Sequence, residues 1–231
     1  MPRPIADGLW AVETPLRFRG LELGRRMAVI RLSGGELLVH SPAQLTPELH
    51  RALDELGPVR FVVPASFLHG HLFMEQYRAA YPQARLFSAP GLPRRRPDLT
   101  FDGELGDSPD PAWAAALDQA LFRAGRFITE VVFCHRASGT LLVGDLCWNV
   151  TPAMPPATRV WAGWRPRVAP TPAFRLAITD RAAARASLER ILSWEFDRIL
   201  IGHGEIVETG GRAALRGAYR RLLGSAGSAR G

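Results

Sequence analysis

The residue best placed for chemistry is His203, which stands between Gly202 and Gly204. The apolar run at residues 199–201 is typical of a buried strand, and it delivers the imidazole to the end of that strand. The two glycines allow a sharp backbone turn and leave the ring uncovered. We therefore expect His203 to face a ligand. The alternative is a buried histidine that donates to a backbone carbonyl and only fixes the strand end.

Asp145 follows a second run of the same kind. Residues 140–143 are again strand-like, and Gly144 precedes the carboxylate. Two polar side chains that follow buried strands in this way indicate one shared site. The alternative for Asp145 is a turn cap, in which the carboxylate accepts backbone N–H bonds.

The first half of the chain predicts the elements that position one side of this site. Residues 27–32 and 36–40 are β-rich runs joined by a short glycine turn, which indicates a hairpin. Thr46 is a suitable N-cap with Pro47 at the first helical position, so a helix is expected up to residue 56. A strand at 60–63, a helix at 72–81 and a strand at 85–88 form a β-α-β unit, which implies parallel pairing.

The second half is less regular. Residues 89–111 are rich in Pro, Gly, Asp and Arg and predict a long ordered loop. A short helix is expected at 113–117, followed by strands at 120–124, 128–135 and 140–145. Residues 147–179 are expected to be irregular, with a short helix near Val160. The chain should then form a helix capped by Thr179, a strand from Ile199 and a closing helix at 211–223.

Length and composition predict one α/β domain over residues 1–223, followed by a flexible tail at 224–231, because 231 residues with 47% hydrophobic content can bury one substantial core. Cys134 and Cys147 are offset in the expected hairpin, which disfavours a disulfide and favours a reducing compartment. No signal peptide and no apolar run of about 20 residues is present, so we expect a soluble, cytoplasmic protein without a membrane partner. The sequence does not indicate an oligomeric state.

The formal charge of +7 does not by itself indicate nucleic-acid binding. All 29 basic residues are arginine, which points to codon composition, and no interleaved set of aromatic residues for base stacking is present. Nucleic acid is therefore disfavoured as a partner. The one tight cluster, Arg94, Arg95 and Arg96, predicts either a solvated loop or a basic rim that attracts a small anionic substrate.

The order of these elements, together with Gly144-Asp145 and the 202–204 motif, resembles the metallo-β-lactamase-like superfamily. Within it, residues 39–42 and 64–71 resemble a branch described as a domain of unknown function. The resemblance covers most of the chain and implies a four-layer αββα sandwich of the α/β class, with metal ligands on loops at one edge. It also implies that Asp145 matches the aspartate that bridges the family's two metals and that His203 matches the last histidine ligand.

The departures from the family pattern are equally informative. Active members carry Thr-His-x-His-x-Asp-His where this chain has residues 64–71, so Ala65 and Phe67 replace the first two histidines. His69 falls where the aspartate would lie, and His71 lies one place beyond the last histidine. The family's central histidine is also absent, because residues 123–126 read Arg-Ala-Gly-Arg. A full two-metal site is therefore excluded.

By the resemblance, the remaining candidates correspond to one of the two metal sites. The predicted ligands are His69, His71, Asp145 and His203, and a catalytic zinc needs three protein ligands. Asp145 would also orient a metal-bound water, and His40 would act as ligand, as supporting partner or as acid/base group. Trp148, close after Asp145, is expected in the pocket wall with the arginines at 94–96.

Two functions remain open from the sequence. The first is a metal-dependent hydrolase with at most one Zn, Fe or Mn ion, acting on an ester, lactone or phosphoester. The second is a catalytically inactive scaffold without metal, which binds a small ligand or a protein partner in the cleft that corresponds to the family's active site. The retained strand-end residues favour the first, and the lost ligands favour the second.

Overall fold

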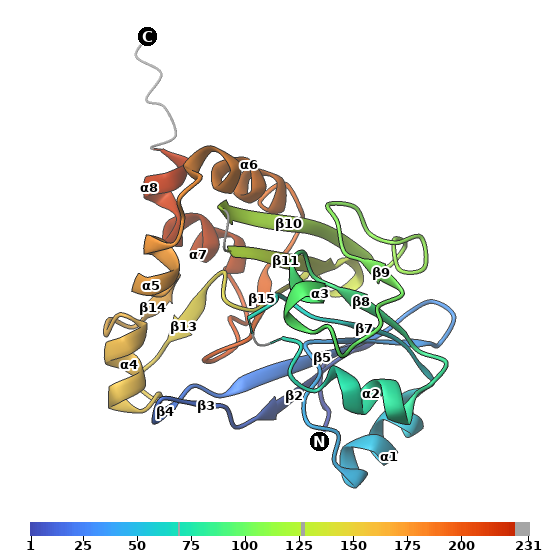
Figure 1. Cartoon of the computed structure of the whole chain (residues 1–231). Helices are drawn as coiled ribbons and strands as arrows, with labels where there is room; N and C mark the ends of the chain where they lie inside the picture. Colours follow the sequence, from blue (N-terminus) through green and yellow to red (C-terminus); the bar gives the residue numbers. More distant parts are fainter. Residues whose placement is uncertain (69, 126–127, 225–231) are drawn as a thin grey trace.

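The computed structural model describes residues 1–68, 70–125 and 128–224. Of the tail predicted at 224–231, residues 225–231 lie outside this part of the chain. Two sheets account for most of the strands (Figure 1). The seven-stranded sheet has the order β1 (Arg3–Ala6), β2 (Leu9–Thr14), β5 (Arg25–Arg31), β6 (Leu37–His40), β7 (Val59–Val63), β8 (Arg85–Ser88) and β9 (Gly103–Glu104). The four-stranded sheet has the order β10 (Leu117–Gly125), β11 (Ile128–His135), β12 (Thr140–Val143) and β15 (Arg198–Ile201).

Two short antiparallel pairs and the helices complete the fold. The pairs are β3 (Arg17–Phe18) with β4 (Leu21–Glu22), and β13 (Trp148–Val150) with β14 (Arg167–Ala169). The helices are α1 (Pro47–Leu56), α2 (Met74–Ala80), α3 (Leu92–Arg95), α4 (Pro156–Ala162), α5 (Pro172–Leu176), α6 (Arg181–Ile191), α7 (Gly211–Ala218) and α8 (Arg220–Leu223), with a 3₁₀ turn at Arg136–Ser138.

Three apolar clusters show that the architecture has four layers. The central cluster joins the inner faces of the two sheets, with Ile30 and Phe61 from one sheet and Phe133 and Leu200 from the other. A second cluster packs α1 and α2 on the outer face of the larger sheet. A third packs α6 and α7 on the outer face of the smaller sheet. The predicted αββα sandwich is therefore confirmed, and Figure 1 shows the two helical layers on opposite sides of the sheets.

The regular part of the N-terminal half agrees with the sequence. Thr46 caps α1 by accepting a hydrogen bond from the Leu49 N–H at 3.2 Å. The β6, β7 and β8 strands pair in parallel, as the β-α-β unit requires. Both cysteines are free, so the expectation of no disulfide is also confirmed. Among the described residues, no helix combines the length and apolar character needed to cross a bilayer.

Several sequence predictions in the second half were wrong. The segment at 89–111 contains α3 and β9, because Leu92 packs into the core and Gly103 pairs with Phe87. Residues 111–116 form turns rather than a helix, and the Trp113 ring is packed against the rings of Phe61 and Phe87.

Two helix boundaries and one irregular segment also differ. Asp180 caps α6 rather than Thr179, whose N–H donates to the Ala124 carbonyl at the end of β10. The closing helix breaks at Tyr219 into α7 and α8. The stretch at 147–179 includes the short helix predicted near Val160, but also the β13–β14 pair and α5. These elements form through tertiary pairing, which a local pattern does not reveal.

Candidate metal centre

Parallel pairing of β12 with β15 brings the two predicted strand ends together. Val143 is opposite Ile201, and the Gly202 N–H donates to the Val143 carbonyl at 2.8 Å. A Cβ atom on Gly202 would lie 2.8 Å from the Gly144 carbonyl oxygen, so only glycine fits at this crossing. The turns that carry Asp145 and His203 are therefore held side by side by backbone contacts.

Asp145 and His203 meet directly. The His203 Nε2 atom lies 3.5 Å from Asp145 Oδ1, which confirms the expected proximity. The imidazole is 1% exposed, so the expectation of an uncovered ring was wrong, because the Trp148 indole stacks on it. The Asp145 side chain is 14% exposed. Because the Nδ1 atom lies 2.6 Å from the Gly24 carbonyl oxygen, which can only accept, Nδ1 must carry a proton. In the neutral ring the Nε2 lone pair then faces Asp145.

Arg26 ties the histidine turn to the larger sheet. Its guanidinium donates to the Ile201 carbonyl and, at 3.0 Å, to the Gly204 carbonyl. The same group forms an ion pair with Glu13 at 3.0 Å. Both backbone segments that flank His203 are thus fixed by a side chain from β5.

Trp148 lies beneath the pair rather than in an open wall. Its indole stacks on the His203 ring with centroids 4.3 Å apart and planes at 26°. Its Nε1–H donates to Asp145 Oδ1 at 3.4 Å. The predicted substrate contact remains a prediction, since Trp148 is buried and its observed contacts orient the two candidate ligands.

Glu130 supports the Asp145 turn and was not predicted from the sequence. Its carboxylate, on β11, accepts the N–H groups of Gly144, Asp145 and Leu146 at 2.7 to 2.8 Å. Burial, and then the charge of Asp145, raise the pKa of Glu130 to about 8, while the three N–H bonds oppose this shift. One acid in the middle of a mostly apolar strand was the available signal. Glu130 fixes the conformation of the turn that presents Asp145.

His40 lies buried at the end of β6, 4% exposed, with its ring edge-on to Phe133 at 5.5 Å. Its Nε2 atom has no hydrogen-bond partner among the described residues, and burial lowers its pKa to about 4. His71 is also 4% exposed, and its carbonyl accepts from Arg96 at 3.1 Å. His69, the remaining predicted ligand, lies outside the described residues.

The predicted four-ligand set is not assembled by the described residues. Within residues 1–68, 70–125 and 128–224, no three His, Cys, Asp or Glu side chains are grouped closely enough to hold a metal ion. His40 and His71 therefore do not complete a site with Asp145 and His203. The described part of the centre is the Asp145–His203 pair, and its supporting contacts among the described residues include those from Glu130, Trp148, Gly24 and Arg26.

The three arginines of the predicted basic cluster have different contacts. Arg96 forms ion pairs with Asp98 at 2.7 Å and with Glu75 at 2.9 Å. Its guanidinium therefore stabilises the local structure around His71. Arg95 lies over the Phe67 ring at 5.9 Å, and Arg94 is exposed. The basic-rim prediction is thus limited to Arg94 and Arg95, and stays a prediction for them.

Comparison with known proteins identifies the family of this chain. A family profile described as "Domain of unknown function (DUF4336)" matches residues 6–174. The chain belongs to the DUF4336 family. The profile spans His40, His69, His71 and Asp145, whereas His203 lies beyond it. A comparison with curated protein sequences finds no match.

Solved structures show that this DUF4336 chain has the metallo-β-lactamase fold. A metallo-β-lactamase from Pontibacter korlensis is 13% identical, with a TM-score of 0.65 over 96% of this chain and 98% of that one. The FIM-1 enzyme of Pseudomonas aeruginosa, in its mono-zinc form, is 12% identical, with a TM-score of 0.62 over 96% of this chain and 92% of that one. A metallo-β-lactamase from Hirschia baltica is 11% identical, with a TM-score of 0.65 over 96% and 97%.

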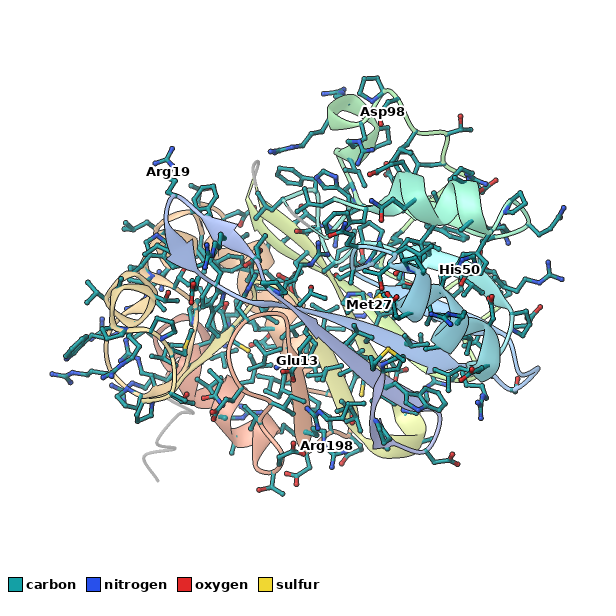
Figure 2. All side chains as sticks on the ribbon, turned by 90° about the horizontal axis from the view of Figure 1, so that it is seen from below. Glu13, Arg19, Met27, His50, Asp98 and Arg198 are labelled. Carbon is teal, nitrogen blue, oxygen red and sulfur yellow. The ribbon has the colours of Figure 1, made fainter. Side chains whose placement is uncertain are left out.

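A cavity of about 380 Å³ lies beside the histidine turn of the DUF4336 chain. It is formed by the β3–β4 hairpin, whose tip carries the outward-pointing Arg19 (Figure 2), together with the start of β5 and both glycines around His203. Glu13 and Glu22 line it, but they pair with Arg26 and Arg17. Arg94, Arg95 and Arg96 are not among its lining residues.

Proposed function

We propose that this chain is a metal-dependent hydrolase with a reduced site that holds at most one Zn, Fe or Mn ion through Asp145 and His203. The fold supports the general class, and the FIM-1 relative is described with a single zinc. His69 is the third ligand that the sequence resemblance supplies to this proposal. The proposed substrates are small esters, lactones or phosphoesters.

The protonation of His203 carries the proposal. With the proton on Nδ1, directed at the Gly24 carbonyl, the neutral ring turns a lone pair toward a carboxylate oxygen 3.5 Å away. A cation held between the two atoms is compatible with this arrangement, as is a second proton on the ring. Histidines that bind metals usually donate their other N–H to a carbonyl or a carboxylate. Two ligand atoms on a tetrahedral zinc, with bonds of about 2.0–2.1 Å, lie about 3.3 Å apart, which is close to the observed spacing.

Other residues of the chain position Asp145 and contribute charge near the site. Glu130 accepts the backbone N–H of Asp145 and so holds the turn, and Trp148 donates to the Asp145 carboxylate. Asp145 is the more exposed member of the pair. A bound metal would lower the pKa of its water and supply a nucleophile near neutral pH. Arg25 lines the adjacent cavity, donates to the Ser41 and Pro42 carbonyls, and pairs with no carboxylate among the described residues. It is the cation we propose to attract an anionic substrate.

Elemental analysis tests this proposal independently of activity. The native protein, incubated with Zn²⁺, Fe²⁺ or Mn²⁺ and then desalted, should retain up to one ion per chain. The variants His203→Ala and Asp145→Asn should each lose it, whereas His50→Ala, which removes a half-exposed histidine on α1, should retain it. If the native protein retains no metal, or if the first two variants retain as much as the control, the inactive-scaffold alternative replaces the proposal.

A substrate panel then tests the reaction class. Chromogenic esters, lactones and phosphodiesters would be assayed with the metal-loaded protein and with the same protein after chelation. Hydrolysis that chelation abolishes, and that His203→Ala abolishes, is the expected result. Metal binding without hydrolysis of any of the three substrate types would contradict the enzymatic part of the proposal.

A further inference from the structure

A second cavity, of about 470 Å³, is lined by residues of β14, α5, α7 and α8. Figure 1 shows these elements on the side of the molecule that carries the C-terminus. The walls of the cavity come from these elements and from the first residue of α6, so the fold brings separate segments together to form it. Cavities of about 300–1,000 Å³ are typical of small-molecule sites. No residue of the Asp145–His203 centre lines this cavity, so it is a separate site.

The lining of this cavity carries charge of one sign. It includes five exposed arginines and neither aspartate nor glutamate; the arginines are Arg167, Arg175, Arg181, Arg220 and Arg221. The Arg181 guanidinium donates to the Arg221 carbonyl at 3.2 Å, which joins the α6 and α8 sides of the cavity. A concave surface lined by charge of one sign concentrates the electrostatic potential and attracts counter-ions. An anion would relieve the mutual repulsion of these arginines.

Composition alone does not explain this cluster. The protein uses only arginine as its basic residue, but elsewhere many arginines have carboxylate partners, such as Arg26 with Glu13 and Arg78 with Asp102. Among the described residues, none of the five cavity arginines forms an ion pair with a carboxylate. Their guanidinium groups are therefore available for an external anion.

The floor of the cavity is apolar and partly aromatic. Tyr219 lines it together with aliphatic residues, namely Ala169, Ile178, Ala218 and Leu222. Tyr219 is 3% exposed, and its hydroxyl donates to the Leu146 carbonyl at 2.5 Å, so the ring is fixed in place. A matching ligand would place an apolar or aromatic body on this floor and its negative charges among the arginines.

We propose that this cavity binds a small organic phosphate, with at least two phosphate charges and an aromatic or apolar body, of about the size of a nucleoside diphosphate. Arginine suits such a ligand because its planar fork pairs bidentately with phosphate oxygens. The limited volume of the cavity, about 470 Å³, favours a small molecule over a nucleic-acid strand, which needs an extended track of backbone contacts.

Isothermal titration calorimetry with ADP, pyrophosphate and adenosine tests the proposal. ADP should bind the native protein more tightly than pyrophosphate does, and adenosine should bind weakly or not at all. The double variant Arg175→Gln/Arg220→Gln should weaken ADP binding about tenfold or more, because each lost charge-assisted hydrogen bond contributes measurably to affinity. Both residues are exposed, so the fold should be retained, and the melting temperature of each variant checks this.

The matched control is Arg51→Gln/Arg216→Gln, which removes the same charge from α1 and from a position of α7 outside the cavity. It should leave ADP affinity within about twofold of the native value, because neither side chain lines the cavity. Equal ADP affinity in the two double variants, or no ADP binding by the native protein, overturns the proposal. A single-stranded oligonucleotide that binds more tightly than ADP, with affinity rising with its length, also overturns it.

Discussion

The buried imidazole of His40 makes stability depend on pH. Burial lowers its pKa from 6.5 to about 4, so the folded protein keeps the ring neutral where the unfolded chain already binds a proton. Stability should therefore fall as the pH drops from about 6.5 to about 4, by up to about 3 kcal/mol from this residue. The variant His40→Gln, which has a non-titrating side chain of similar size, should lose this part of the pH dependence.

Urea unfolding at pH 7 and pH 5 would measure the effect as the change in the free energy of unfolding. The comparison variant is His50→Gln, because His50 is half-exposed and pairs only loosely with Asp54 at 3.7 Å. A pH dependence in His40→Gln equal to that of the native protein and of His50→Gln would show that His40 titrates normally.

Glu130 should contribute to stability through the turn that it holds. In Glu130→Gln, one carboxylate oxygen becomes an amide NH₂, which cannot accept the backbone N–H it faces. Leaving a buried donor without its partner should cost about 1–3 kcal/mol of unfolding free energy. The same variant should bind less metal than the native protein, because Asp145 lies in this turn.

The midpoint of urea unfolding and the metal content together test this expectation. Glu36→Gln, at a surface carboxylate whose side chain is 39% exposed, provides the control. A Glu130→Gln protein with native stability and native metal content would rule out the positioning role.

Sequence reasoning found Asp145 and His203 because each directly follows an apolar run and a glycine, which is a local pattern. It did not find the residues that support them. Arg26 contacts the histidine turn from 175 positions away, and Glu130 accepts from residues 14 to 16 positions away. Such partnerships depend on strand order and register, which one sequence does not display.

At the scale of elements, the crossing of Gly144 and Gly202 sets the distance between the two ligand-bearing turns. Gly202→Ala would place a methyl group 2.8 Å from a backbone oxygen, and backbone cannot move aside cheaply. The substitution should cost about 1–3 kcal/mol, as overpacked cores do. It should also weaken metal retention, because it separates Asp145 from His203.

Gly217 on α7 provides a control substitution for which the expected change in stability has the opposite sign. A Cβ atom there meets nothing within 4 Å, so Gly217→Ala should stabilise the protein by about 0.5–1 kcal/mol through helix propensity alone. Thermal unfolding of both variants would check the pair. A Gly202→Ala protein as stable as Gly217→Ala would show that the crossing can relax.

The elements that were predicted correctly carry their signals locally. Thr46 and Pro47 mark the start of α1, and the hairpin of β5 and β6 has its glycine turn in the sequence. By contrast, β9 exists only because Gly103 pairs with Phe87, and α6 starts one residue late because Thr179 bonds to Ala124. Short elements that depend on distant partners lie beyond a local pattern.

At the scale of the whole molecule, the two sheets share the central apolar cluster and should unfold together. Neither sheet can expose that inner face without losing burial for residues such as Phe133 and Phe61. We therefore expect one cooperative thermal transition, with equal calorimetric and van't Hoff enthalpies. Differential scanning calorimetry measures both, and two resolved transitions would contradict the expectation of a single domain.

The order of the two sheets along the chain has a consequence for synthesis on the ribosome. The seven-stranded sheet is built from residues 3–104, whereas the strands that cover its inner face come from residues 117–201. Gly24 and His203 are 179 residues apart. At a translation rate of about 5–20 residues per second, His203 is therefore synthesised roughly 10–35 s after Gly24. During that interval the nascent sheet has an uncovered apolar face, and a chaperone that binds such faces would be needed most while the second sheet is still being translated.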